Sequence, residues 1–315
     1  MITRNTKPII DLVIPVFNNE GTLPEIVERV SEVQTLIPNY DIQIIFVDDG
    51  SKDNSLDVLR KLKNQYKRKL CIHIAILSKN VGQTLAILTG MQLAKGSALI
   101  VMSADLQDDP KTIIEFVREY ETGNEVVIGI RKIREDSFLV RTLSAFAYFI
   151  IRIKLPSYPK KGFDFYLLDS KVTSVLLRRR LSRYRYLQVE ILSSGYNIGH
   201  VNYVRRKRTI GKSMNKFSSK FRFFSIAMLD SSPLLIRTTF ALGCAFVFVS
   251  FCLGVAAIMN YFNGNSLFPG FVTLFILILF SSGINILLLG IIGEYVWRIY
   301  SSSRESSEIY VKTVE

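Results

Sequence analysis

Two apolar runs in the first third of the chain end in acidic residues. Residues 44–47 run into Asp48 and Asp49, and residues 99–102 run into a stretch that contains Asp105. Carboxylates accept hydrogen bonds from hydroxyl and amide groups and are ligands of hard cations. In an open α/β sheet the ligand crevice lies beyond the carboxyl ends of the strands. One such cluster alone is equally well explained as a helix cap, but two in one sheet favour a binding site.

The elements that position these residues alternate between strand and helix over residues 1–130. This alternation predicts a mostly parallel, Rossmann-like α/β sheet with helices on both faces. Pro24 and Pro110 are expected in the first turns of helices, and Asp108 and Asp109 are expected to cap the helix that follows them. The expected strands are residues 9–16, 42–47, 72–77, 98–102 and 126–130, and the expected helices are residues 22–35, 54–65, 83–94 and 110–120.

The last quarter of the chain contains two long uncharged segments. Residues 238–261 include no charged residue over 24 positions, and residues 267–293 include none over 27. Each segment is long enough to cross the hydrocarbon core of a bilayer, about 30 Å thick, as a helix. We expect a transmembrane hairpin with spans at residues 236–261 and 267–293, and two buried core helices are the alternative.

Basic residues flank this hairpin on both sides. Arg237 precedes the first uncharged segment, and Arg298 and Arg304 follow the second. The positive-inside rule therefore predicts a protein of the inner membrane whose large N-terminal domain and both termini are cytoplasmic. The chain has no recognisable signal peptide, and its three cysteines lack disulfide or metal spacing, as is usual in a reducing compartment.

The net charge of +13 is concentrated between residues 131 and 222, which hold 22 Lys and Arg against 5 Asp and Glu. A basic segment before a membrane hairpin is expected to lie on anionic lipid headgroups. Residues 138–155 and 216–229 have the pattern of amphipathic interfacial helices, with packed surface helices as the alternative. Nucleic-acid binding is not expected, because the chain contains no recognised nucleic-acid-binding module.

Five short motifs occur in a fixed order along the chain. They are Pro-Val-Phe-Asn-Asn-Glu at 15–20, Val-Asp-Asp-Gly-Ser at 47–51, Asn-Val-Gly-Gln at 80–83, Ser-Ala-Asp-Leu-Gln-Asp-Asp-Pro at 103–110 and Gly-Glu-Tyr-Val-Trp-Arg-Ile-Tyr at 293–300. The first four together resemble glycosyltransferase family 2, an inverting family with the GT-A fold. With the hairpin and the motif at 293–300, the chain resembles the polyprenyl-phosphate glycosyltransferase branch, which includes dolichyl-phosphate mannose synthases and bacterial undecaprenyl-phosphate glucosyl and aminoarabinosyl transferases.

The resemblance implies a site for a nucleotide diphosphate-sugar donor, expected to be a UDP-sugar. In the family, the loop after the first strand and the carboxylate after the second hold the base and ribose, and a later basic loop folds over the diphosphate. In this chain the basic loop reads Arg-Thr-Ile-Gly-Lys-Ser, with Met214 in place of a final lysine. The residues that match the donor site are Pro15, Phe17, Asn18, Glu20, Asp48, Asp49, Gly50, Asn80, Gln83, Arg208 and Lys212.

The resemblance also implies Mg²⁺ or Mn²⁺ on the donor diphosphate, with Asp105 and Gln107 as side-chain ligands. The family stretch often reads Asp-x-Asp-x-Gln, and Ser103 stands here in the place of its first acid. This departure predicts weaker metal binding, or a coordination that depends more on the substrate. Asp108 and Asp109 are the alternative ligands.

For the acceptor, a polyprenyl phosphate, the resemblance implies that Arg131, Arg141 and Ser144 bind the phosphate group. Asp105 and Asp164 are the implied catalytic carboxylates, and a structural role for Asp164 is the alternative. The acceptor phosphate is dianionic near neutral pH, so it is already a nucleophile. Bringing two anions together, rather than deprotonation, is therefore the expected difficulty of the reaction.

The expected function is inverting transfer of one sugar to undecaprenyl phosphate at the cytoplasmic membrane face, which makes a lipid-linked sugar donor for cell-envelope glycans. A catalytically weak or inactive membrane scaffold is one alternative, suggested by Ser103, Tyr166 and Met214, which depart from the family pattern. A processive polysaccharide synthase is another. It is disfavoured because Trp297 is the only tryptophan and does not lie in the Gln-x-x-Arg-Trp motif of such enzymes.

The expected organisation has five parts. A nucleotide-sugar-binding core spans residues 1–130, an acceptor-side half with basic helices spans 131–235, and the two membrane spans precede a cytoplasmic tail at 294–315. Small residues in the second span leave association with a second copy open, namely Gly283, Gly290 and Gly293.

Overall fold

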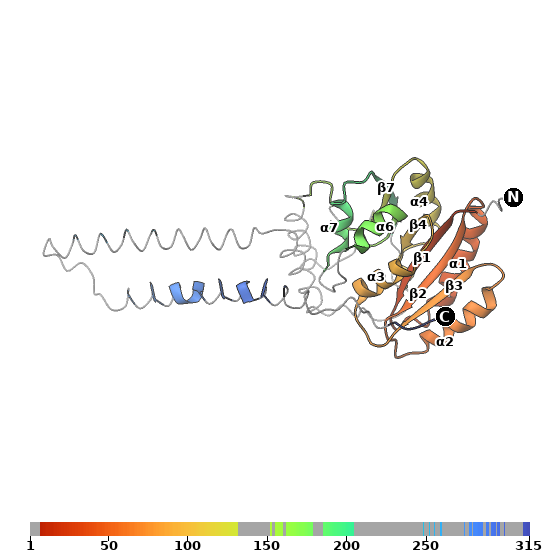
Figure 1. The fold of residues 1–315 in the computed structure, drawn as a ribbon, viewed down its shortest axis with the longest axis horizontal. Helices are drawn as coiled ribbons and strands as arrows, with labels where there is room; N and C mark the ends of the chain where they lie inside the picture. The colour runs from red at the N-terminus through yellow and green to blue at the C-terminus, as the bar shows by residue number, and fades with distance from the viewer. Residues whose placement is uncertain are drawn as a thin grey trace. The chain divides into compact units, whose positions relative to one another are not determined.

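The computed structural model divides the chain into two compact units, one of Met1–Ser231 with Glu305–Glu315 and the other of Ser232–Arg304. In the described part of the chain, no helix is long and apolar enough to cross a membrane. Most residues of the predicted spans and interfacial helices lie outside the described residues, although about half of the second span is described. The structure describes residues 7–131, 155–159, 162–178, 185–204 and 311–315, with Arg152 and scattered helical residues between 248 and 299 (Figure 1).

Every strand and helix predicted before Arg131 is present, with bounds within two residues of the expected ones. Elements β6 to β8, with the helices between them, were not predicted. The described elements are β1 (Ile9–Val16), α1 (Leu23–Leu36), β2 (Asp41–Asp48), α2 (Ser55–Tyr66), β3 (Cys71–Leu77), α3 (Gln83–Leu93), β4 (Ala98–Val101), α4 (Thr112–Glu121), β5 (Val126–Arg131), β6 (Tyr166–Asp169), α6 (Ser170–Leu177), α7 (Leu187–Leu192), β7 (Ile198–Tyr203) and β8 (Val311–Val314).

The strands form one sheet in the order β7-β5-β6-β4-β1-β2-β3-β8. β1 is parallel to β2 and β4, β2 is parallel to β3, and β5 is parallel to β7. β6 runs antiparallel to β4 and β5, and β8 runs antiparallel to β3. The predicted mostly parallel sheet is therefore confirmed. The strand order changes direction at β1, with β2 on one side and β4 on the other, and ligands of α/β proteins bind at such a switch point.

The core lies on both faces of the sheet, because successive side chains of a strand point to opposite faces. Leu12 and Ile14 of β1 are fully buried among residues of α1, α2 and α4. Val13, between them, is fully buried on the other face with residues of α3, α6 and α7. Figure 1 shows helices on the two sides of the sheet, as the alternation predicted.

Residues 311–314, predicted only as part of a tail, form an edge strand. Glu315 N donates to Ile74 O at 2.9 Å, and Ile74 N donates to Glu315 O at 3.0 Å. Arg60 of α2 forms an ion pair with the Glu315 carboxylate at 2.5 Å. The last strand thus pairs with the exposed side of β3, whose N–H and C=O groups would otherwise form an open sheet edge.

Gly90 lets α3 lie directly on the sheet. A Cβ at this position would be 2.3 Å from Val13 Cγ1 and 3.2 Å from Val47 Cγ2. Both valines are fully buried and cannot move into solvent. The close approach places the start of α3, and the loop before it, at the carboxyl ends of β1 and β2.

We expect Gly90→Ala to lower the free energy of unfolding by about 1–3 kcal/mol, because overpacking of the interface outweighs the better helix propensity of alanine. Denaturant unfolding of the purified protein measures this change. Gln92→Ala, an exposed position of the same helix, is the control and should lie within about 0.5 kcal/mol of wild type. A Gly90→Ala variant as stable as wild type contradicts the prediction.

Candidate functional site

The end of β1 lies beside the first acidic cluster. Val16 pairs in register with Asp48, and Asp49 N donates to Val16 O at 2.8 Å. Pro15 and Phe17 are half-buried at the same strand end. The structure therefore brings together the two motifs that were predicted to hold the base and ribose.

Asn18 and Glu20 join the loop after β1 to the loop after β2. Asn18 Oδ1 accepts from Lys52 N at 2.8 Å, and Glu20 Oε2 accepts from Asn54 N at 2.9 Å. Glu20 N donates in return to Asp53 Oδ2 at 3.2 Å. Asn18 has a φ of +54°, a left-handed conformation that asparagine adopts more easily than most residues. The two predicted donor-site residues thus hold two loops in one arrangement.

Asp49 fixes the loop between β3 and α3. Its Oδ1 accepts from Val81 N at 2.6 Å, and its Oδ2 accepts from Gly82 N at 2.9 Å. Burial raises the pKa of this carboxyl above the usual aspartate value, and the bonds from Val81 and Gly82 oppose that rise. Both carboxylate oxygens are therefore engaged with the backbone, so the structure gives Asp49 a positioning role.

Gly50 allows the same two loops to touch. It has a φ of +70°, and a Cβ there would lie 2.9 Å from Asn80 N. Asn80 and Gln83 are exposed on the loop and first helical turn that Asp49 and Gly50 hold in place. Asp48 is buried, and its Oδ1 accepts from Ser51 N at 3.3 Å. These predicted donor-site residues all lie at the carboxyl ends of β2 and β3.

The second acidic cluster surrounds one hydroxyl group. Ser103 Oγ lies 2.8 Å from Asp105 Oδ1 and 2.8 Å from Asp108 Oδ2. A hydroxyl has one proton, so it donates to one of these carboxylates at a time. Asp105 is 9 % exposed and Asp108 is fully buried. Ser103, which replaces the family's first acid, is therefore the bridge between two acids.

The turn after Asp105 is strained. Leu106 is buried and has a φ of +57°, a conformation that residues with a side chain rarely adopt. Such strain persists where the surroundings impose it, and it is common at functional sites. The turn brings Gln107 N to 3.2 Å from Asp105 Oδ1. The contact involves the backbone of Gln107, so the predicted role of its side chain as a metal ligand stays a prediction.

Asp108 does not have its predicted capping role. Helix α4 begins at Thr112, has Lys111 at its N-cap and has no side-chain cap bond. Asp109 Oδ1 accepts from Lys111 N at 3.1 Å, close to the predicted cap. Asp108 instead faces inward, where its Oδ1 accepts from the Tyr203 hydroxyl at 2.7 Å. The prediction for Asp108 was wrong because its partner lies 95 residues away in the sequence.

The Tyr203 hydroxyl connects this cluster to the predicted acceptor residues. Arg131 Nε donates to Tyr203 Oη at 3.4 Å, and another Arg131 N–H donates to Asp164 in a short ion pair. Gln188 Nε2 donates to Asp164 Oδ1 at 3.2 Å. The predicted residues Asp105, Arg131 and Asp164 therefore belong to one polar network. Tyr203 and Gln188 were not predicted, because neither stands in a motif.

The pKa values of Arg131 and Tyr203 are both raised in this network. Burial alone would lower the pKa of Arg131, but Asp164, Tyr203 and Asp108 together outweigh burial, so the pKa rises and the guanidinium stays charged. Burial and the Asp108 carboxylate raise the pKa of Tyr203 above the usual tyrosine range, so its hydroxyl keeps its proton. Arg131 is therefore the charged donor that joins Asp164 to the Tyr203 hydroxyl, and through that hydroxyl to Asp108.

The donor set of this cluster fits a divalent cation. Carboxylate and hydroxyl oxygens are the ligands that Mg²⁺ and Mn²⁺ prefer. Among the described residues, no three His, Cys, Asp or Glu side chains form a complete metal cage. Mg²⁺ sites often use one or two carboxylates and complete their coordination with water and substrate phosphate oxygens. Asp105 is suited to such a site.

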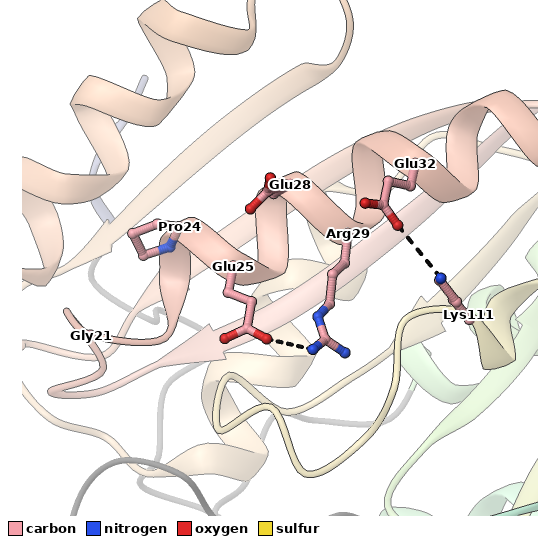
Figure 2. A pocket seen from close by; sticks show the side chains of 7 residues that line it. All are labelled: Gly21, Pro24, Glu25, Glu28, Arg29, Glu32 and Lys111. Carbon is pink, nitrogen blue, oxygen red and sulfur yellow. Dashed lines mark hydrogen bonds and ion pairs between the residues drawn. The ribbon is translucent and has the colours of Figure 1, made fainter.

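Four predicted site residues lie outside the described residues, namely Arg141, Ser144, Arg208 and Lys212. Figure 2 shows a groove along α1 that contains none of the predicted site residues. Its side chains pair with one another, Arg29 with Glu25 at 2.5 Å and Lys111 with Glu32 at 3.7 Å. The groove therefore shares no residue with the network around Asp105.

We expect Asp49→Asn to lower the free energy of unfolding by about 1–3 kcal/mol, because an amide has one acceptor oxygen and turns an NH₂ group toward Val81 or Gly82 N–H. Denaturant unfolding measures the loss. Asp57→Asn removes the same charge from a side chain that is 70 % exposed and should change stability by less than about 0.5 kcal/mol. Equal effects of the two substitutions would show that the Asp49 bonds contribute nothing.

Ser103→Asp places a third carboxylate between Asp105 and Asp108. We expect the variant to unfold at a lower temperature than wild type in EDTA, because the charges repel. We expect it to gain more stability than wild type from added Mn²⁺, since a ligand that binds the native state raises stability by mass action. Thermal unfolding with and without Mn²⁺ tests this. Ser174→Asp, on the exposed face of α6, is the control, and an identical Mn²⁺ response in all three proteins contradicts the prediction.

Comparison with known proteins agrees with this geometry. The family model "Glycosyl transferase family 2" matches residues 11–224. A bactoprenol glucosyl transferase of Shigella phage SfV is 28% identical over 309 residues, which cover 96% of this chain and 98% of that protein. An undecaprenyl-phosphate 4-deoxy-4-formamido-L-arabinose transferase of Pseudomonas aeruginosa is 28% identical over 318 residues, which cover 97% of this chain and 90% of that protein.

A solved structure with the same fold is mannosyl-3-phosphoglycerate synthase from Rubrobacter xylanophilus. It aligns with a TM-score of 0.53 and 14% sequence identity, over 70% of this chain and 72% of that one. At this identity the likeness shows the fold alone, which is the GT-A α/β fold. The match of the family model, which spans residues 11–224, also shows the family. The chain belongs to glycosyl transferase family 2 and is a glycosyltransferase.

Proposed function

We propose that this glycosyltransferase transfers one sugar from a nucleotide diphosphate-sugar, with a UDP-sugar as the expected donor, to a polyprenyl phosphate with inversion at the anomeric carbon. The observation that carries the proposal is the network that joins Asp105, at the donor side, to the Arg131–Asp164 pair. Relatives named for bactoprenol and undecaprenyl phosphate, which are similar over nearly their whole length, support a lipid phosphate as acceptor.

The donor side is built from the loops after β1, β2 and β3. Pro15, Phe17 and Asp48 bind the base and ribose. The loops that carry them are held in place by the hydrogen bonds of Asn18, Glu20 and Asp49. Such preorganisation lowers the cost of ordering the loops when the nucleotide binds. Asn80 and Gln83 border the same site. Arg208 and Lys212 belong to the proposal as residues that close over the diphosphate.

Mg²⁺ or Mn²⁺ would supply positive charge to the departing diphosphate, and Asp105 with Gln107 would hold it. Asp105 Oδ1 contacts both the Ser103 hydroxyl and the backbone N–H of Gln107.

The acceptor side centres on Arg131. Its bonds to Tyr203 and Asp164 use two of the five N–H groups of the guanidinium and fix its plane. Arginine binds phosphate oxygens in pairs, and it stays charged at all relevant pH values. Arg131 therefore binds the acceptor phosphate, Asp164 holds the guanidinium in orientation, and Arg141 and Ser144 complete the site.

In the proposed reaction an oxygen of the acceptor phosphate attacks the anomeric carbon in line with the bond to the nucleoside diphosphate. A new C–O bond forms as the C–O bond to the diphosphate breaks, and its electron pair leaves with the diphosphate oxygen. The dianionic acceptor needs no general base. The residues of the site hold two anions in contact and compensate their charge, which is positioning and electrostatic stabilisation.

The proposal includes a place at the cytoplasmic face of the inner membrane, with residues 236–261 and 267–293 as spans and the basic region 131–222 on the headgroups. It is supported by the uncharged length of the two segments and by lipid-linked acceptors in the names of the relatives. The product would be a lipid-phosphate sugar for cell-envelope glycans. Association of copies through the second span remains part of the proposal.

We expect membranes that contain the protein to transfer labelled sugar from at least one UDP- or GDP-sugar to undecaprenyl phosphate, giving a lipid product that mild acid cleaves. Asp105→Asn should lower the rate about 100-fold or more, because it removes a charge at the site of charge development. Asp57→Asn should match wild type. Donor binding without product from any of the nucleotide sugars would favour an inactive scaffold and contradict the proposal.

A further inference from the structure

A buried chain of polar groups joins the donor and acceptor sides of the site, and the proposed contacts with the substrates do not explain it. The Tyr203 hydroxyl donates to Asp108 Oδ1 at 2.7 Å and accepts from Arg131 Nε at 3.4 Å. Asp108 is 0 %, Tyr203 5 % and Arg131 6 % exposed. The other Asp108 oxygen is 2.8 Å from Ser103 Oγ, which also contacts Asp105. Ionised groups are buried at a cost unless they are paired, so each of these contacts matters to its partners.

The sheet places Tyr203 for this contact. β5 and β7 are parallel neighbours, and Arg131 and Tyr203 are opposite each other in their register. Gly129, two residues before Arg131, leaves room for the tyrosine ring, because a Cβ there would be 2.9 Å from Tyr203 Cε1. Phe165 packs edge-on against the same ring with centroids 5.7 Å apart. Backbone register and ring packing thus fix the hydroxyl between a carboxylate and a guanidinium.

Other roles fit Asp108 and Tyr203 less well. Asp108 does not cap α4, whose N-cap is Lys111. Both Asp108 oxygens already contact a hydroxyl, one of Ser103 and one of Tyr203. A tyrosine needed for packing alone would be served equally by phenylalanine, which has the same ring. The hydroxyl is therefore the part of Tyr203 that requires an explanation.

We propose that Tyr203 is a positioning residue whose hydroxyl, anchored on Asp108, orients the Arg131 guanidinium toward the acceptor phosphate. The inference rests on the proposed function, in which Arg131 binds that phosphate. Without the hydroxyl, Asp108 loses a hydrogen-bond donor and Arg131 Nε loses an acceptor. Of its contacts with the described residues, only the ion pair with Asp164 then holds the guanidinium, which turns toward the Asp108 carboxylate and away from the acceptor.

The test compares Tyr203→Phe with Tyr186→Phe. Tyr186 is also a buried tyrosine, and its hydroxyl is 2.7 Å from the Tyr158 hydroxyl, so the control loses a buried hydroxyl bond of the same kind. Farnesyl phosphate is the acceptor probe and UDP is the donor probe, and calorimetry on the full-length protein measures both affinities. If Tyr203 had a merely structural role, the substitution would lower the affinity for both probes or for neither.

We expect Tyr203→Phe to lower the affinity for farnesyl phosphate about tenfold and to leave the affinity for UDP within about twofold of wild type. Tyr186→Phe should leave both affinities unchanged. In the Arg131→Lys background, Tyr203→Phe should have little further effect on farnesyl phosphate, because the group that it orients is gone. The loss in transfer should likewise be a higher KM for the polyprenyl phosphate at an unchanged KM for the donor.

The outcomes separate the two proposals. Equal farnesyl phosphate affinity in wild type and Tyr203→Phe overturns the inference, even if wild type transfers sugar normally. A wild type that binds no farnesyl phosphate overturns it as well, since Arg131 then has no acceptor to face. The wild type could transfer no sugar to polyprenyl phosphate while Tyr203→Phe still lowers the affinity for farnesyl phosphate and not that for UDP. In that case the proposed function fails and the positioning role of Tyr203 stands.

Discussion

The site depends on how one buried guanidinium is shared among carboxylates. Arg131 is paired directly with Asp164, and it is linked to Asp108 through a hydroxyl that keeps its proton. Asp108 is linked in turn to Asp105 through Ser103. The network thus joins a cluster of carboxylates, which are ligands that divalent cations prefer, to a guanidinium, a group that binds anions.

The sheet brings these groups together although they are distant in sequence. Asp105 follows β4, Arg131 ends β5 and Tyr203 ends β7, and β6 is inserted antiparallel between β4 and β5. On the other side of β1, Asp49 and Gly50 press the loops after β2 and β3 into contact. The change of strand order at β1 therefore separates the cluster of Asp48 and Asp49 from the cluster of Asp105 and Asp108, which explains why the two acidic clusters have different partners.

The first 131 residues were predictable because their pattern is local. Strands and helices alternate there with regular lengths, and Pro24 marks a helix start. β6 and β8 are four residues long and pair with strands distant in sequence, which no local pattern indicates. Asp108 was predicted to be a helix cap because Asp-Asp-Pro before a helix usually contains one. Its role is instead set by the hydrogen bond from Tyr203, which lies in a region where no element was predicted. Asp105, Arg131 and Asp164 were found through family motifs, and their connection was not.

The measurement that tests the central claim most directly is the anomeric configuration of the sugar in the lipid product, determined by NMR after reaction with a donor of known configuration. In-line attack by the acceptor phosphate predicts a single inversion, so an α-linked nucleotide-sugar gives a β-linked polyprenyl-phosphate sugar. A lipid product of retained configuration, or sugar attached to anything other than the lipid phosphate, would contradict the account.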